Sequence, residues 1–190
     1  ITEDFSDNMT VTDSHNYGDI IIEDVTTTSD TYIGGLFGIK NDSVNINHTN
    51  CSNNGDIVVK KGCTLATNSY IGGLLGVSSA KGGNIVFTSC TNNGKVDVEE
   101  GVNLSSIYAG GIVGYKSGDG LITIENATNK GAVIYNATGT GVLQIAGIIG
   151  SYASTNTTLT LKKTVTNEGV ITIGGTAKGN VRIGGIFGAF

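Results

Sequence analysis

An internal repeat of about 38 residues is the feature that most constrains how this 190-residue chain can fold. An Asn-x-Gly element occurs five times, and its glycines are spaced 37, 39, 37 and 38 residues apart: Gly18, Gly55, Gly94, Gly131 and Gly169. A second element, small-Gly-apolar-apolar-Gly, recurs at spacings of 38, 38, 36 and 38 residues and starts at Gly34, Gly72, Gly110, Ala146 and Gly184. Two elements that keep one period indicate five copies of one supersecondary unit.

Each copy contains short runs of alternating apolar residues, the pattern of half-buried β-strands. One run follows the Asn-x-Gly element, with apolar residues at Ile20 and Ile22, Ile57 and Val59, Val96 and Val98, Val133 and Tyr135, and Ile171 and Ile173. A second run lies upstream, at Met9 and Val11, Ile46 and His48, Ile85 and Phe87, Ile122 and Ile124, and Leu159 and Leu161. The glycine-rich element is the third predicted strand, and polar segments such as 26–31 and 60–68 are predicted loops.

Three strands per copy without helical periodicity predict an all-β fold, a parallel β-helix (β-solenoid) of five coils. The single domain spans 1–190, with copies at about 8–38, 44–76, 84–114, 121–150 and 158–188. A β-prism or propeller of antiparallel blades is the main rival, because Asn54-Gly55 and Asn93-Gly94 also suit hairpin turns. One asparagine column favours the solenoid, since stacked asparagine side chains can bond to one another along the axis. The column contains Asn16, Asn53, Asn92, Asn129 and Asn167.

Composition argues against several other classes. Glycine makes up 30 of 190 residues and proline is absent, without the Gly-X-Y pattern of collagen. The hydrophobic content of 38% is enough for a folded core. The net charge of −5 and the single arginine, Arg182, argue against nucleic-acid binding. No apolar run approaches the roughly 18 residues of a membrane span, and the start at Ile1 without a signal segment indicates a mature or excised piece.

The three cysteines, an odd number without metal-ligand spacing, predict neither a disulfide framework nor a zinc site. Cys51 and Cys90 lie in a column of small residues, four before the Asn-x-Gly glycine, that is expected to face inward. They would be neighbours in adjacent coils, about 4.8 Å apart, either as a buried thiol pair or as a disulfide between coils. Cys63 lies in a predicted loop and is expected to be a surface thiol.

The segment Tyr-Ile-Gly-Gly-Leu-Phe-Gly at 32–38, repeated with variations at 70–76 and 108–114, resembles the GLUG-type repeats of large secreted and surface proteins, including bacterial adhesins. The resemblance covers nearly the whole chain. It implies an extracellular or cell-surface setting, and an adhesive or scaffolding role within a longer polypeptide. It carries no catalytic residues over to this chain.

No catalytic, cofactor-binding or metal-binding constellation stands out, and the sequence predicts no enzymatic activity. A nucleophile needs a base in reach, and the only histidines, His15 and His48, belong to no motif and are predicted to be ordinary strand or turn residues. Asp19 and Asp56 share one column, where they either form a solvated turn face or bind a cation or sugar weakly. With one arginine, the chain lacks the basic residues that hold acidic sugars in lyases and hydrolases.

Two surface features point toward carbohydrate. The glycosylation motif Asn-x-Ser/Thr occurs eight times. Either several of these sites are occupied, if the protein is a eukaryotic secreted protein, or the motifs arise by chance in a chain rich in Asn, Ser and Thr. The candidate asparagines are Asn8, Asn41, Asn47, Asn50, Asn103, Asn126, Asn136 and Asn156. Tyr32, Tyr70 and Tyr108 share one column, where they could hold sugar rings by their apolar faces or form a plain strand-surface ladder.

The repeat therefore predicts a structural or adhesive module, a rigid stalk or a filament building block, with a carbohydrate-binding or carbohydrate-active β-helix as the alternative. Expected partners are copies of the same chain or neighbouring domains, and glycans. Contacts are expected at the coil ends, where no capping unit is visible, and at the glycine-rich element. There, two apolar rows are expected to point in opposite directions, one into the core and one toward a partner. The rows are Ile33, Ile71, Ala109, Ile145 and Ile183, and Leu36, Leu74, Ile112, Ile148 and Ile186.

Overall fold

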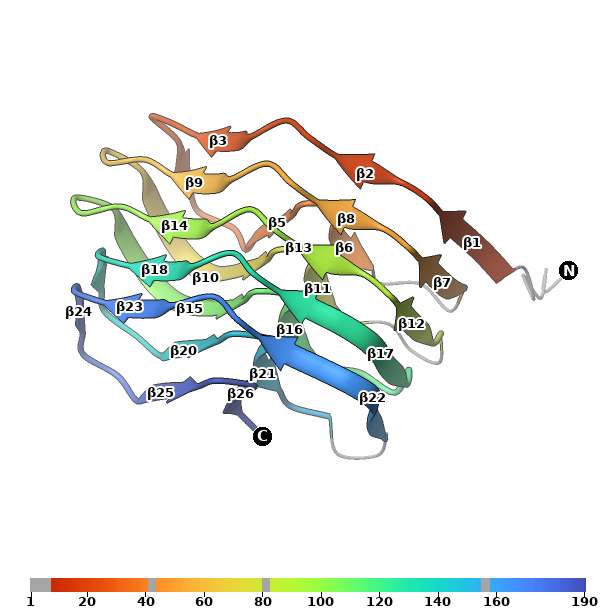
Figure 1. The fold of residues 1–190 in the computed structure, drawn as a ribbon. Helices are drawn as coiled ribbons and strands as arrows, with labels where there is room; N and C mark the ends of the chain where they lie inside the picture. Colours follow the sequence, from red (N-terminus) through yellow and green to blue (C-terminus); the bar gives the residue numbers. More distant parts are fainter. Residues whose placement is uncertain (1–7, 41–43, 80–82, 155–157) are drawn as a thin grey trace, which may run out of the picture.

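The computed structural model describes residues 8–40, 44–79, 83–154 and 158–190. Within these ranges every strand pairs in parallel with its counterparts in neighbouring coils, and no helix is formed. Figure 1 shows the coils stacked as successive rungs, from the red first coil to the blue last coil. The predicted five-coil parallel β-solenoid is confirmed, and the antiparallel alternative is wrong.

Four parallel sheets form the walls of the solenoid. Sheet 1 contains β1 (Asn8–Thr12), β7 (Asn45–Thr49), β12 (Ile85–Thr88), β17 (Ile122–Asn129) and β22 (Leu159–Asn167), with β2 (His15–Asn16), β8 (Ser52–Asn53) and β13 (Thr91–Asn92). Sheet 2 contains β3 (Ile20–Ile22), β9 (Ile57–Val59), β14 (Val96–Val98), β18 (Val133–Tyr135) and β23 (Ile171–Ile173).

The other two sheets meet at the glycine-rich element. Sheet 3 contains β4 (Thr26–Thr27), β5 (Thr31–Gly34), β10 (Thr64–Gly72), β15 (Asn103–Gly110), β19 (Thr138–Gly139), β20 (Leu143–Ala146), β24 (Thr176–Ala177) and β25 (Val181–Gly184). Sheet 4 contains β6 (Phe37–Lys40), β11 (Leu75–Ser78), β16 (Val113–Lys116), β21 (Ile149–Tyr152) and β26 (Phe187–Ala189). The predicted single glycine-rich strand is thus two strands, and the segments 26–31 and 60–68, predicted as loops, are partly strand.

The five asparagines of the Asn-x-Gly elements form a ladder along one side of the interior. The Nδ2 group of each donates to the Oδ1 atom of the asparagine in the next coil, at 2.7 to 3.0 Å. The same Nδ2 group donates to the glycine carbonyl two residues further on, at 2.7 to 2.9 Å. Both amide hydrogens are therefore used in each of the first four coils. Because Asn53, Asn92 and Asn129 are fully buried, these bonds replace the hydrogen bonds to water that their side chains lose on folding.

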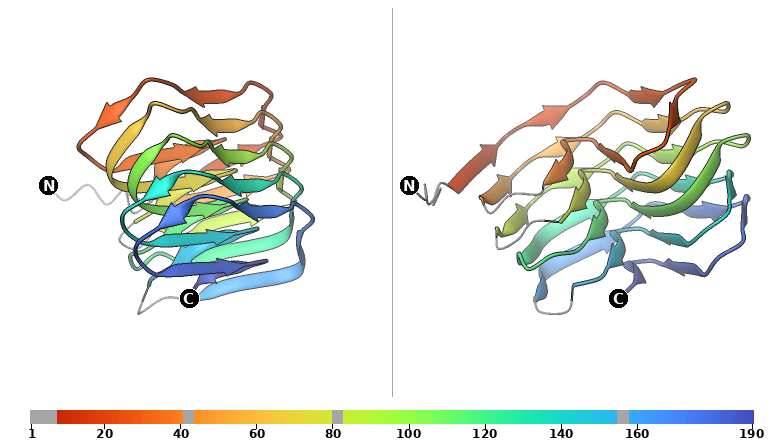
Figure 2. Two further views of the ribbon diagram at one scale, coloured as in Figure 1. Left: turned by 90° about the vertical axis from the view of Figure 1, so that its left-hand side faces the viewer. Right: turned by 180° about the vertical axis from the view of Figure 1, so that it is seen from behind.

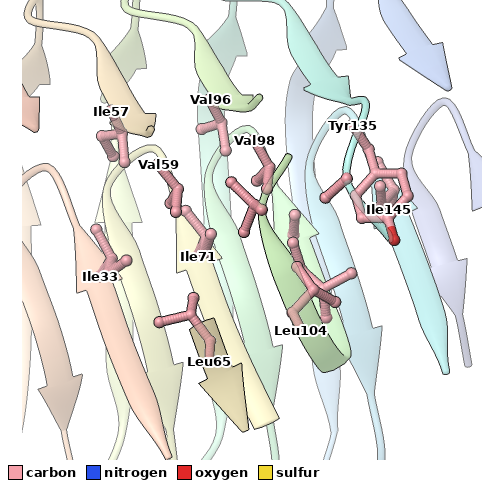
Figure 3. Packing of buried hydrophobic residues seen from close by; sticks show 14 of the residues in the cluster. Ile33, Ile57, Val59, Leu65, Ile71, Val96, Val98, Leu104, Tyr135 and Ile145 are labelled. Carbon is pink, nitrogen blue, oxygen red and sulfur yellow. The ribbon is translucent and has the colours of Figure 1, made fainter. Parts of the chain in front are cut away.

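The glycine-rich element lies against this asparagine ladder from the opposite wall. A Cβ atom added at Gly73 would overlap the side chain of Asn92, and one added at Gly111 would overlap that of Asn129. The contact divides the interior into two hydrophobic clusters, which we call lobe A and lobe B. Lobe A lies between sheets 2 and 3, where Ile57, Val59, Leu65 and Ile71 approach one another (Figure 3). Lobe B lies between sheets 1 and 4 and includes Phe87, Ile124 and Leu75.

The two apolar rows of the glycine-rich element both point inward, which corrects the expectation of an exposed row. Ile71 and Ile145 are buried in lobe A, and Leu74 and Ile148 are buried in lobe B. The chain bends between sheets 3 and 4 at the two glycines, so residues on the two sides of the bend enter different lobes. This element therefore leaves no apolar stripe open to a partner in the middle coils.

The cysteines are free thiols, and all three are buried. The Sγ atom of Cys51 lies 3.3 Å from the carbonyl oxygens of Val11 and Thr49, and that of Cys90 lies 3.6 Å and 3.4 Å from those of His48 and Thr88. Burial raises the pKa of the Cys90 thiol to about 11. The expectation that Cys63 is a surface thiol is wrong, because its side chain enters lobe A at the corner between sheets 2 and 3.

His48 is a strand residue whose ring is buried in lobe B. Its ring stacks on Phe87 at a centroid distance of 4.8 Å and contacts Phe37 at 5.0 Å. Its Nδ1 atom has no hydrogen-bond partner among the described residues. Burial lowers the pKa of His48 to about 4, because an imidazolium in this apolar site would lose its hydration.

Among the described residues, no helix is both long enough and apolar enough to cross a membrane.

Replacing Gly111 with Ala should lower the free energy of unfolding by about 3 kcal/mol, the upper range of overpacking. The added methyl group would force Asn129 away from the position in which it bonds to its neighbours. Gly185→Ala is the control, since it lies in the same column and its Cβ would meet no atom within 4 Å. Urea unfolding at low protein concentration measures both variants, and equal stabilities would contradict the steric role of the glycine column.

The stability of the protein should fall between pH 6.5 and pH 4 through His48. Its folded pKa of about 4 lies below the usual value of 6.5, so the unfolded chain binds the proton first and is stabilised relative to the folded protein as the pH falls. The loss is about 3 kcal/mol. His48→Phe, which matches Phe87 in the next coil, should remove this part of the pH dependence. Parallel curves for the two proteins over this range would rule out the buried neutral imidazole.

Candidate functional site

Three tyrosines of sheet 3 form an outward-facing ladder. Tyr32, Tyr70 and Tyr108 are in register on β5, β10 and β15. The rings of Tyr32 and Tyr70 are nearly parallel at a centroid distance of 5.5 Å, and those of Tyr70 and Tyr108 lie 5.1 Å apart. The column continues through Gln144 to Arg182. The sequence thus placed these three rings in one column, and the structure brings them into direct contact.

A fourth tyrosine completes this cluster from the neighbouring sheet. Tyr115 on β16 lies 5.1 Å from Tyr70 and 4.9 Å from Tyr108, measured between ring centroids. The two sheets come this close because Gly114 has no side chain, and a Cβ atom there would overlap the backbone of Ile71. We call Tyr32, Tyr70, Tyr108 and Tyr115 the tyrosine cluster. Its fourth member was missed in the sequence because its own column contains no other tyrosine.

The hydroxyl groups of the tyrosine cluster are uncharged at physiological pH. Burial is the main cause that raises the pKa of Tyr70, Tyr108 and Tyr115, so their hydroxyl groups stay protonated and can donate hydrogen bonds. The ring faces within the ladder cover one another. A sugar ring could therefore stack only on the face at a ladder end, or lie across the ring edges and hydroxyl groups.

A cavity of about 650 Å³ lies beside the C-terminal part of the same column. Its lining includes Gln144, Ser151, Tyr152, Arg182 and Phe190. Gln144 is buried, and its Oε1 atom has no hydrogen-bond partner among the described residues. The cavity thus offers an unsatisfied acceptor, the single guanidinium of the chain and aromatic rings within one hollow.

Six of the glycosylation candidates lie in the described ranges, and none of these is buried; Asn41 and Asn156 lie outside the described residues. Asn8, Asn50, Asn103 and Asn126 are exposed, while Asn47 and Asn136 are partly covered. The Nδ2 atom is the atom to which a glycan is attached. In Asn50 it donates to Asp13, and in Asn126 it donates to Ser89. A glycan at either position would have to replace a hydrogen bond between coils.

The stacked carboxylates bond to turn backbone. An oxygen of Asp19 accepts from the Asp56 amide at 2.8 Å, and an oxygen of Asp56 accepts from the Lys95 amide at 3.0 Å. His15 is an exposed residue that bonds to Ser52. In the part of the chain that the structure describes, no three His, Cys, Asp or Glu side chains converge as a metal site would require. These groups support the turns and do not converge on one point.

Two buried lysines, Lys40 and Lys116, were not anticipated from the sequence. The ammonium of Lys116 is fully buried and donates to the carbonyl oxygens of Ser117 and Gly118. Desolvation, with a smaller contribution from Lys40, lowers the pKa of Lys116 to about 8. Lys40, Ser78 and Lys116 occupy one column of sheet 4. Since the ammonium is held by the loop that follows its own strand, its contacts indicate a role in fixing that loop.

Comparison with known proteins identified no relative of this chain. A scan of protein-family models, a search of curated proteins and a search of solved structures each found no match for this chain.

Proposed function

We propose that the chain is a structural repeat module of a secreted or cell-surface protein, which acts as a rigid stalk or as a filament building block. The observation that carries the proposal is the asparagine ladder, which joins all five coils by hydrogen bonds that are buried between the middle coils and partly buried at the first and last. Parallel strands on all four walls pair each coil with the next. A repeat built this way sets a length of about 4.8 Å per coil along its axis.

Two observations support the extracellular setting. The glycine-rich element resembles that of secreted and surface repeat proteins, and six candidate glycosylation asparagines lie on accessible parts of the chain. The proposed function involves no enzymatic role, because the two histidines, the stacked carboxylates and the buried Lys116 do not share a site among the described residues. Adhesive contacts would then come from the outward side chains of the coils or from neighbouring domains.

Electron microscopy of thin sections of source cells, labelled with a gold-conjugated antibody against the 190-residue chain, tests this function. We expect gold particles on the outer cell surface, aligned on projecting stalks or along filaments. Labelling confined to the cell interior would contradict the proposal. A strain that lacks the gene controls for antibody specificity.

A second candidate function, sugar binding, is favoured by the tyrosine cluster and the adjacent cavity. Aromatic rings and neutral hydroxyl groups are the side chains that recognise sugars without charge. In this case Tyr70→Ala should weaken binding to a glycan array at least tenfold, because it removes the ring that contacts three others. Tyr17→Ala is the control, since Tyr17 is exposed and lies outside the cluster. An array on which the unmodified chain binds no glycan would eliminate this candidate.

A further inference from the structure

Coil three is one residue shorter than the other coils where it crosses sheet 3. In each of the other coils, three residues separate the two paired segments of this sheet, as at 66–68 and 140–142. In coil three, Ser105 and Ser106 alone fill the same interval. Because the flanking residues are held in register with the neighbouring coils, the shorter segment must follow a straighter path than its neighbours. β15 is therefore recessed between coils two and four.

A hollow of about 220 Å³ lies over this recessed strand, and we call it the β15 trough. Its lining includes Thr64 and Ala66 from coil two, Asn103 and Ser105 from coil three, and Thr140 from coil four. Hydroxyl and amide groups provide its polar side chains, and none of the described residues that line it is charged. Figure 2 shows the green strand β15 between the yellow strand β10 and the teal coil four, so described coils flank the trough on both sides.

The β15 trough and the tyrosine cluster lie along the same strand. Ser105 in the trough precedes Tyr108 by three residues, which separates the two sites by about 10 Å along the strand. Tyr70 on β10 and Tyr115 on β16 both contact the ring of Tyr108. A molecule that reaches both sites must therefore be extended, with apolar surface at one end and hydrogen-bonding groups at the other.

The chemistry of the two sites fits an uncharged oligosaccharide better than a peptide. β15 pairs with β10 on one side and with β19 and β20 on the other, so both edges of the strand are occupied and a peptide cannot add to it as a further strand. The leucines of the trough, Leu65 and Leu104, direct their side chains into lobe A, so they form no outward apolar pocket for a peptide side chain. Sugar rings combine apolar faces with peripheral hydroxyl groups, and these match the tyrosine cluster and the trough in turn.

We propose that the chain binds an uncharged oligosaccharide that extends from the tyrosine cluster into the β15 trough. One sugar ring packs against Tyr70 and Tyr108, and another forms hydrogen bonds with Asn103, Ser105 and Thr140. The two rings of a disaccharide lie too close together to fill both sites, so the bound glycan is longer. This inference rests on sugar binding, the second candidate function, and deepens it by naming a second subsite and the class of glycan.

Calorimetric titration with disaccharides and hexasaccharides of the glucose, mannose, galactose and xylose series tests the two subsites. One hexasaccharide or more should bind about tenfold more tightly than its disaccharide, the gain expected from one or two additional hydrogen bonds. Ser105→Phe fills the trough and should remove this gain while the disaccharide affinity stays unchanged, and Ala66→Phe should do the same from coil two. Thr123→Phe is the control, because it adds the same ring to a partly exposed position of sheet 1. The chain is produced without N-glycans, since a glycan on Asn103 would itself fill the trough.

The outcomes separate this inference from the function on which it rests. Hexasaccharides that bind no more tightly than disaccharides would overturn the trough as a subsite and leave sugar binding at the tyrosine cluster standing. Full hexasaccharide affinity in folded Ser105→Phe and Ala66→Phe proteins, verified by thermal melting, would do the same. A chain that binds none of these sugars would eliminate the second candidate function and this inference together. In that case, binding to a peptide array that Ser105→Phe abolishes would assign the trough to a protein partner.

Discussion

The side-chain amide of asparagine, with two hydrogens to donate and one oxygen that accepts, is the group on which the rest of this solenoid depends. In the middle coils it satisfies a turn carbonyl in its own coil and an identical amide in the next, so one residue type fixes both the turn and the stacking register. Since the amides are buried, losing one partner leaves another polar group unsatisfied. The bulk of the same amide also requires glycine on the facing wall.

The coil number, the parallel stacking and the asparagine column could be predicted because each depends only on spacing along the chain. A column such as Asn53, Asn92 and Asn129 is visible once the copies are aligned, and amide ladders have a well-defined geometry. The strand that follows each Asn-x-Gly element was predictable for a similar reason. Inward and outward side chains alternate along this strand without interruption, so every second residue faces the interior.

The errors arose where the backbone changes direction. The period-two argument treated the glycine-rich element as one strand, but the bend between β10 and β11 resets the phase and sends Ile71 and Leu74 into different lobes. Cys63 was misplaced because its loop is polar on average. Its column also contains Val102 and Ala137, an apolar corner that alignment of the loops could have revealed. The contact between Tyr70 and Tyr115 depends on the angle of the same bend, which spacing along the chain does not specify.

The division of the interior into two lobes has a consequence for how such a repeat can diverge. A change of side-chain volume in lobe A is accommodated by neighbours in lobe A, since the asparagines and glycines between the lobes leave no path for repacking. The aligned copies already show this freedom, with Val59, Val98 and Tyr135 filling one position of lobe A while Phe87 and Ile124 fill one position of lobe B. Each half of the coil can therefore evolve as a separate module, while the asparagine and glycine columns between the two lobes stay invariant.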